Sequence, residues 1–134
     1  MAKEIPIGAS GEARQSVEFQ HTLTAHHPQL PPVYSTPDMI RLMEVAAFHA
    51  LQPYCEAGEI TVGTAIDIEH HAASGVGATI EAQAVLESFD GRFYVLRVSA
   101  RDDSQEIGRG TVTRAVVSTS KFLAKINRTK NKAQ

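Results

Sequence analysis

The sequence contains a single cysteine, Cys55, which excludes an intramolecular disulfide. One cysteine fits a reducing compartment, so we expect a cytoplasmic location. No hydrophobic run approaches the ~18 residues that a membrane-spanning helix needs. The first residues, Met1 to Pro6, also lack the apolar centre of a signal peptide. We therefore expect neither a membrane partner nor secretion.

An excess of charge of one sign is also missing. The net charge is -2, which gives no electrostatic reason to expect nucleic acid as a partner. Basic residues near the end of the chain are typical of a helix C-terminus and a solvated tail: Lys121, Lys125, Arg128, Lys130 and Lys132.

Several catalytic motifs are absent as well. The serine-hydrolase elbow does not occur. Two histidine pairs, at 26–27 and 70–71, lack further ligands at a helpful spacing, so we expect no metal. Cys55 has no obvious base nearby and is interpreted as inert. We expect no resident cofactor.

The length of 134 residues predicts one domain, 1–134, without repeats or linkers. We expect residues 1–15 to form a flexible N-terminal arm and residues 128–134 a flexible tail. Alternation over 16–24 predicts a strand, and the proline-rich segment 26–32 predicts a loop.

A long amphipathic helix is predicted over about 37–52. Ser35 or Thr36 can act as its N-cap, and Pro37 suits the first helical position. Apolar residues then recur with helical periodicity and form one broad apolar face. Glu44 lies within this apolar environment, where an unpaired carboxylate is costly.

The second half of the chain is rich in β-strand patterns. Strands are predicted over 59–69, 79–87, 92–101 and 107–118, with a hairpin turn at Asp90-Gly91 and a short closing helix over 121–127. A curved antiparallel sheet wrapped around the one central helix is the simplest way to bury that helix. The fold class is therefore α+β.

Three polar residues are candidates for chemistry: Thr36, Glu44 and His70. A hydroxyl, a carboxylate and an imidazole at one cleft would suit acyl transfer. Each also has a structural alternative. Thr36 would be only an N-cap, Glu44 would pair with Arg41 or reach solvent, and His70 would be a satisfied histidine at a strand end. His71 points to the opposite face of the strand.

The chain resembles the hotdog-fold acyl-CoA thioesterases, most closely the fluoroacetyl-CoA thioesterase branch. The resemblance runs from about Val33 to Leu123 and rests on the order and spacing of six motifs: Ser35-Thr36-Pro37, Glu44, Thr61-Val62-Gly63-Thr64, Glu69-His70, Asp90-Gly91-Arg92 and Ile107-Gly108-Arg109-Gly110.

This resemblance implies roles for particular residues. Thr36, Glu44 and His70 fall on the family's catalytic group, Gly63 on a glycine beside the thioester, and Arg114 on an arginine near the substrate. The structural alternatives are a β-bulge at Gly63 and a sheet-face ion pair at Arg114. The family's dimers imply a site shared between subunits, with Thr36 and Glu44 from one and His70 from the other. Pairing of dimers into tetramers stays open.

The chain also departs from that branch. It has Ala65 and Ala73-Ser74 where relatives have histidine and Pro-Thr. The loop before the helix offers His26, His27, Leu30 and Tyr34 in place of a phenylalanine-rich lid; we expect Leu30 and Tyr34 to contact substrate. The resemblance therefore implies hydrolysis of acyl-CoA thioesters in general rather than fluoroacetyl selectivity, with CoA as part of the substrate.

Two other functions remain open. One is a non-catalytic hotdog protein that binds acyl-CoA or a related metabolite. The other, a hotdog dehydratase, fits less well because Thr36 has no clear role in it.

Overall fold

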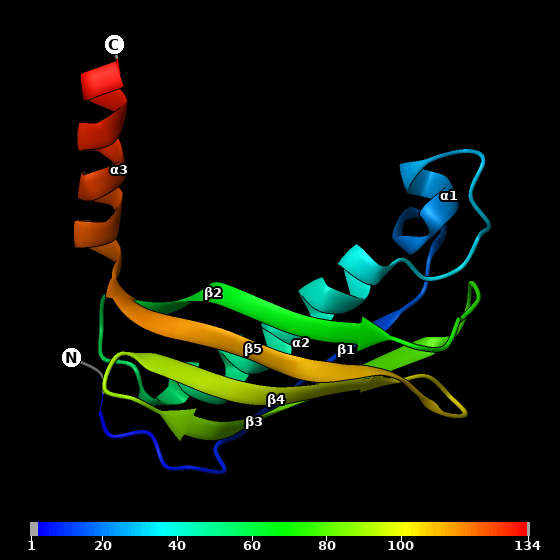
Figure 1. The fold of residues 1–134 in the computed structure, drawn as a ribbon, viewed down its shortest axis with the longest axis horizontal. Helices are drawn as coiled ribbons and strands as arrows, with labels where there is room; N and C mark the ends of the chain where they lie inside the picture. Colours follow the sequence, from blue (N-terminus) through cyan, green and yellow to red (C-terminus); the bar gives the residue numbers. More distant parts are fainter. Residues whose placement is uncertain (1–2, 134) are drawn as a thin grey trace.

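The computed structural model describes the backbone of residues 3–133 and the side chains of residues 3–127. Five antiparallel strands form one sheet in the order β1-β3-β4-β5-β2, and the long helix α2 lies across one face (Figure 1). The strands are β1 (Ser10–Ser16), β2 (Glu59–His70), β3 (Thr79–Phe89), β4 (Phe93–Arg101) and β5 (Glu106–Ser118). The predicted α+β architecture is confirmed.

Helix α2 (Thr36–Leu51) is the centre of the core. Ser35 is its N-cap, with its hydroxyl accepting a hydrogen bond from the backbone N–H of Asp38. Seven residues of one apolar face are buried against the sheet: Met39, Leu42, Met43, Ala46, Ala47, Ala50 and Leu51. The predicted helix is thus confirmed, and the short helix η2 (Gln52–Tyr54) follows it.

The four predicted strands of the second half are also present. β3 and β4 are joined at Asp90-Gly91, where Gly91 adopts a φ of 101°, a conformation that favours glycine. The Asp90 carboxylate accepts hydrogen bonds from the backbone N–H groups of Arg92 and Phe93. This turn chemistry explains why the hairpin was visible in the sequence.

The N-terminal predictions were wrong. Residues 10–15, expected in a flexible arm, belong to β1, which pairs with β3. A Cβ at Gly11 would clash with the carbonyl oxygen of Ala46, so β1 packs directly on α2. The strand expected over 16–24 is replaced by two short helices, η1 (Phe19–His21) and α1 (Leu23–His26). Phe19, expected on the apolar face of that strand, is 60% exposed.

The C-terminal helix is longer than predicted. Helix α3 covers Thr119–Ala133, so helical backbone continues through most of the expected tail; Gln134 lies outside the described residues. The helix stands away from the sheet (Figure 1). None of the helices in the described part of the chain combines the length and apolarity that crossing a membrane requires.

Candidate active site

Thr36 and His70 meet at one end of the sheet. The hydroxyl oxygen of Thr36, in the first turn of α2, lies 2.9 Å from Nδ1 of His70, the last residue of β2. Because Ser35 caps the helix, the Thr36 hydroxyl is available for this hydrogen bond. The pair borders an open pocket of about 280 Å³, whose other lining residues are Leu23, Val33, Tyr34, His71, Ala72 and Ala73.

The environment of His70 favours a neutral imidazole. Burial lowers the pKa of His70 below its ordinary value of 6.5, and the neighbouring His71 lowers it further, against a raising contribution from a backbone hydrogen bond at Ala72. Nε2 is buried and has no hydrogen-bond partner among the described residues. A neutral histidine with one bonded and one unbonded nitrogen can transfer a proton.

Glu44 is held by a second cluster farther along α2. One of its carboxylate oxygens, Oε2, lies 3.2 Å from Nη1 of Arg114 on β5, whose side chain is only 8% exposed. Arg114 also donates hydrogen bonds from Nε to the Thr61 hydroxyl, at 2.9 Å, and from Nη2 to the Thr61 carbonyl, at 2.8 Å. The ion pair expected of Arg114 is present, and Glu44 pairs with it rather than with Arg41. The other carboxylate oxygen, Oε1, is buried without a hydrogen-bond partner in the described chain.

Gly63 lies directly beside this carboxylate. A Cβ at this position would clash with Oε2 of Glu44, so no other residue fits without displacing the carboxylate. The register of β2 against β5 shifts between Gly63 and Ala65, which is the bulge considered as an alternative. The bulge given as the structural alternative for Gly63 is therefore present, and the predicted position of Gly63 beside the thioester stays a prediction.

The bulge decides which side chains share a face. Side chains alternate along a strand, so Gly63 and His70, seven positions apart, would point to opposite faces of a regular strand. The inserted residue shifts the alternation by one, and both positions face α2. Sequence spacing alone did not reveal this.

The three candidate groups do not converge within one chain. Thr36 and Glu44 are separated by two helical turns, about 12 Å along α2. Gly63, which marks the position of the Glu44 carboxylate, lies about 23 Å from His70 along β2. The expected division, with Thr36 and Glu44 from one subunit and His70 from the other, is wrong in one respect, because Thr36 and His70 pair within a single chain.

Tyr34 and Leu30 have different surroundings. The Tyr34 ring is buried, lines the Thr36–His70 pocket and stands edge-on to His70, with ring centroids 6.5 Å apart. Its hydroxyl donates a hydrogen bond to the Gln15 side chain, and burial raises the pKa of Tyr34. Leu30 is 43% exposed on the loop and is not among the pocket-lining residues. Their contact with substrate stays a prediction.

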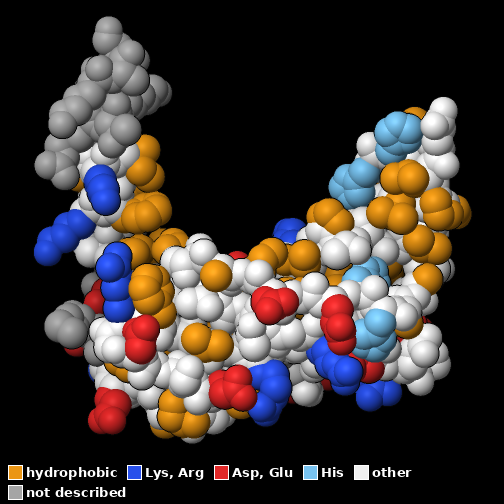
Figure 2. Space-filling view, viewed as in Figure 1, with side chains coloured by type: hydrophobic (Ala, Val, Ile, Leu, Met, Phe, Trp, Pro, Cys, Tyr) orange, Lys and Arg blue, Asp and Glu red, His pale blue; other side chains and the backbone are white. Residues whose placement is uncertain are grey.

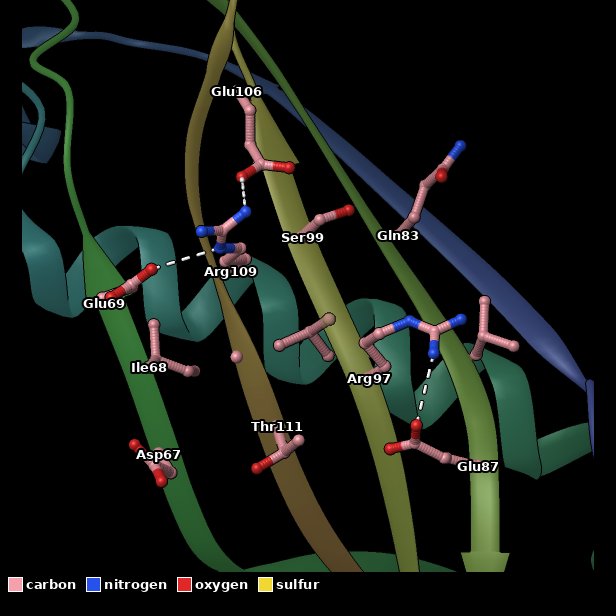
Figure 3. Close-up of a pocket in the computed structure, with 13 residues that line it drawn as sticks. Asp67, Ile68, Glu69, Gln83, Glu87, Arg97, Ser99, Glu106, Arg109 and Thr111 are labelled. Carbon is pink, nitrogen blue, oxygen red and sulfur yellow. Dashed lines mark hydrogen bonds and ion pairs between the residues drawn. The ribbon is translucent and has the colours of Figure 1, made fainter.

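A larger depression lies on the opposite face of the sheet. It measures about 710 Å³, is open, and is lined by both charged and apolar side chains (Figure 3). Its arginines are already paired, Arg97 with Glu87 and Arg109 with Glu69 and Glu106. Thr36, Glu44 and His70 do not line it. An open groove crossed by exposed ion pairs lacks the enclosed wall that an acyl group needs, so size alone does not make it the active site.

The sequence analysis did not single out Thr61 as functional. Its side chain is 3% exposed and accepts the hydrogen bond from Arg114 Nε. The available signal was its position two residues before Gly63, on the same strand face, where a buried hydroxyl requires a partner.

Comparison with known proteins identifies the family of this chain. Residues 17–120 match the family model for the fluoroacetyl-CoA-specific thioesterase. A fluoroacetyl-CoA thioesterase from Streptantibioticus cattleyicolor is 46% identical over 98 residues, which cover 73% of this chain and 70% of the relative. This chain belongs to the fluoroacetyl-CoA-specific thioesterase family.

Solved structures agree with the family assignment. The structure of the fluoroacetyl-CoA thioesterase FlK is 37% identical, with a TM-score of 0.87 over 94% of this chain and 98% of that one. A thioesterase-superfamily protein from Thermus thermophilus is 26% identical, with a TM-score of 0.90 over 96% of both chains. The predictions of a hotdog fold and of a thioester hydrolase are confirmed for this member of the fluoroacetyl-CoA-specific thioesterase family.

Proposed function

We propose that this chain hydrolyses acyl-CoA thioesters to a carboxylic acid and free CoA. The observation that carries the proposal is the 2.9 Å hydrogen bond between Thr36 and a partly buried His70, whose pKa burial lowers, in a chain of the thioesterase family. CoA is part of the substrate here and not a resident cofactor. We also propose a cytoplasmic location, which the single cysteine supports.

In this mechanism, Glu44 takes a proton from water, which adds to the thioester carbonyl, or Glu44 attacks the carbonyl itself. The backbone at Gly63 stabilises the resulting oxyanion. The carbon–sulfur bond breaks, and Nε2 of the neutral His70 accepts the proton taken from water and passes it to the departing CoA sulfur. Thr36 orients the imidazole through Nδ1 or attacks in place of water. Tyr34, Leu30 and Arg114 contact the substrate around these groups.

The two roles of Glu44 can be distinguished by a single turnover in water enriched in a heavy oxygen isotope. If Glu44 attacks, a mixed anhydride forms, and water that adds to the Glu44 carbonyl of this anhydride places the label in the Glu44 carboxylate. If Glu44 activates water, the label appears only in the product acid.

The free edge of β2 supports a homodimer. β2 is the last strand of the sheet and pairs only with β5 in the described chain. Its central residues, 64–67, are all exposed, and Ile66 is 52% exposed. A long unpaired edge with an exposed apolar residue is a template for another strand. We propose that two copies of β2 pair antiparallel about a two-fold axis near Ala65, within this exposed run.

This pairing would bring the separated groups together. With the axis at Ala65 and the bulge counted as one ladder position, Gly63 of the partner subunit lies opposite Ile66, which is four residues, about 13 Å, from His70 along the strand. Along β2, the partner's Gly63 and the Glu44 carboxylate beside it are thus nearer to His70 than Gly63 of the same chain, which is about 23 Å away. The proposed site combines Thr36 and His70 of one subunit with the partner's Glu44.

Complementation between two inactive variants tests this composite site. Co-expressed Glu44→Gln and His70→Ala chains form heterodimers with one intact composite site, so a statistical mixture should recover roughly a quarter of the wild-type activity. If all three groups acted within one chain, both sites of the heterodimer would be dead. No recovery from a mixture shown to contain heterodimers would reject the composite site.

Thiol release from a panel of acyl-CoAs tests the activity itself. Short, fluorinated, branched, aromatic and long acyl groups should be compared at equal concentration. Release of free CoA supports the hydrolase, and saturable binding without release supports the binding protein instead.

A further inference from the structure

Helix α3 presents an apolar face that nothing in the described chain covers. Phe122, Leu123 and Ile126 are 38%, 51% and 48% exposed. Ile126 follows Phe122 by four positions and Leu123 by three, so the three side chains lie on one side of the helix. Figure 2 shows hydrophobic side chains of α3 along the side that faces the hollow between α3 and the α1 region. Lys121 lies on the opposite side of the helix. Such a stripe on a helix is typical of a contact surface.

The shape of the chain indicates what fills the hollow. α3 and the α1 region both rise beyond the free edge of β2, one at each end of that strand (Figure 1). A second copy that pairs with β2 must enter between them. The uncovered face of α3 is therefore continuous with the strand edge at which the proposed dimer forms.

Two-fold symmetry fixes which part of the partner α3 reaches. Glu59 pairs with Ser118, and the Thr119 N–H bonds the Gly58 carbonyl, so α3 begins beside the first residues of β2. With the axis at Ala65 and the bulge counted as one ladder position, the partner's Glu59 lies opposite His70. The partner's α3 then starts about two strand spacings, or ~10 Å, from His70 and runs toward this chain.

We infer that the apolar face of α3 docks on a second copy of this chain, at the rim of the pocket that holds Thr36 and His70. The inference rests on the proposed dimer and extends it. The rim of that pocket is itself apolar or small: Leu23, Val33 and Ala72 are half-buried, and Ala73 is exposed. Each subunit thus supplies an apolar wall to the active site of the other, where the acyl group of the substrate lies.

Cross-linking between differently tagged chains tests the contact. One chain carries Leu123→Cys and the other Ala73→Cys, both with Cys55→Ser, and a short bismaleimide joins nearby thiols. We expect a heterodimeric cross-link. The matched control replaces Leu123→Cys with Lys121→Cys, on the opposite side of α3, and should give a much lower yield.

The outcomes separate the two proposals. A monomer by light scattering overturns the dimer and the docking together. A dimer without the 123–73 cross-link, or with equal yield from the Lys121→Cys control, overturns the docking alone. The docking alone is also overturned if the main cross-linked product joins two Leu123→Cys chains to each other.

Kinetics provides a second measurement. Leu123→Glu should raise KM for a medium-chain acyl-CoA by roughly tenfold, because a charge replaces a buried leucine in the acyl wall. KM for acetyl-CoA should change much less, since a short acyl group does not reach the wall. Lys121→Glu introduces the same side chain on the other side of the helix and should leave both values near wild type. Equal effects of the two variants on both substrates would contradict the inference.

Discussion

Arg114 joins Glu44 to Thr61. Its guanidinium lies 3.2 Å from the Glu44 carboxylate and donates two hydrogen bonds to Thr61, one of them to the hydroxyl. Three elements, α2, β5 and β2, are therefore fixed relative to one another at a single buried arginine. The orientation of the carboxylate depends on this arginine as much as on the helix that carries it.

Replacement of Thr61 should disturb Glu44 at a distance. Thr61→Val leaves the Nε–H of a buried guanidinium without its acceptor, which should reduce the free energy of unfolding by about 1–3 kcal/mol. We expect kcat/KM to fall as well, because Arg114 can then shift away from the carboxylate. Denaturant titration and thiol release measure the two effects. Thr61→Ser keeps the hydroxyl and should stay near wild type; a Ser variant as impaired as Val would contradict this account.

Glu44→Gln should remove activity and preserve the fold. The amide keeps the shape of the side chain but is neither a base nor a nucleophile, so kcat should fall by about 10²–10⁴. The circular dichroism spectrum should be unchanged. Glu56→Gln, a change of the same type outside the site, is the control. Wild-type turnover in Glu44→Gln would reject the catalytic assignment.

Gly63→Ala should lower activity by steric displacement. The new Cβ would clash with Oε2 of Glu44, so the carboxylate must move away from its position beside Arg114. Gly75→Ala is the matched control, because no atom lies within 4 Å of a Cβ there. We expect steady-state kinetics to show a large fall in kcat for the first variant and little change for the second. Comparable losses in both would mean that the close approach at Gly63 is unimportant.

The pH dependence of kcat/KM should report His70. Its pKa is lowered, so the neutral form persists below the ordinary value of 6.5, and activity should decline only as the pH falls through this lowered pKa. The same shift contributes stability that is present above pH 6.5 and lost as the pH falls through the folded-state pKa.

A neighbouring histidine supplies the control for that profile. His71 is exposed, and its Nε2 lies 3.2 Å from the Glu106 carboxylate, whereas the Thr36 hydroxyl pairs with His70. His71→Gln should retain activity and an acidic limb, displaced slightly upward because His71 lowers the pKa of His70. If the acidic limb disappears in His71→Gln, the titration belongs to His71, and its assignment to His70 is wrong.

Local sequence signals determined much of the fold. The α2 boundaries followed from a Ser cap, Pro37 and one continuous apolar face, and the β3–β4 hairpin followed from Asp90-Gly91. Such signals are readable because the residues that cause them are neighbours in the chain. β1 escaped detection because its segment is polar and small, and its strand conformation comes from pairing with β3 and from the close fit of Gly11 on α2.

The sequence by itself determined the family, the central helix and the residue types available for chemistry. Only the tertiary structure decided which of them meet. Thr36 contacts His70, 34 positions away in the sequence, because α2 begins where β2 ends. Glu44 pairs with Arg114 because β5 passes beneath the helix. The bulge after Gly63 then turns Gly63 and His70 to the same face. These contacts arise from packing and register between distant segments, which no local pattern of residues encodes.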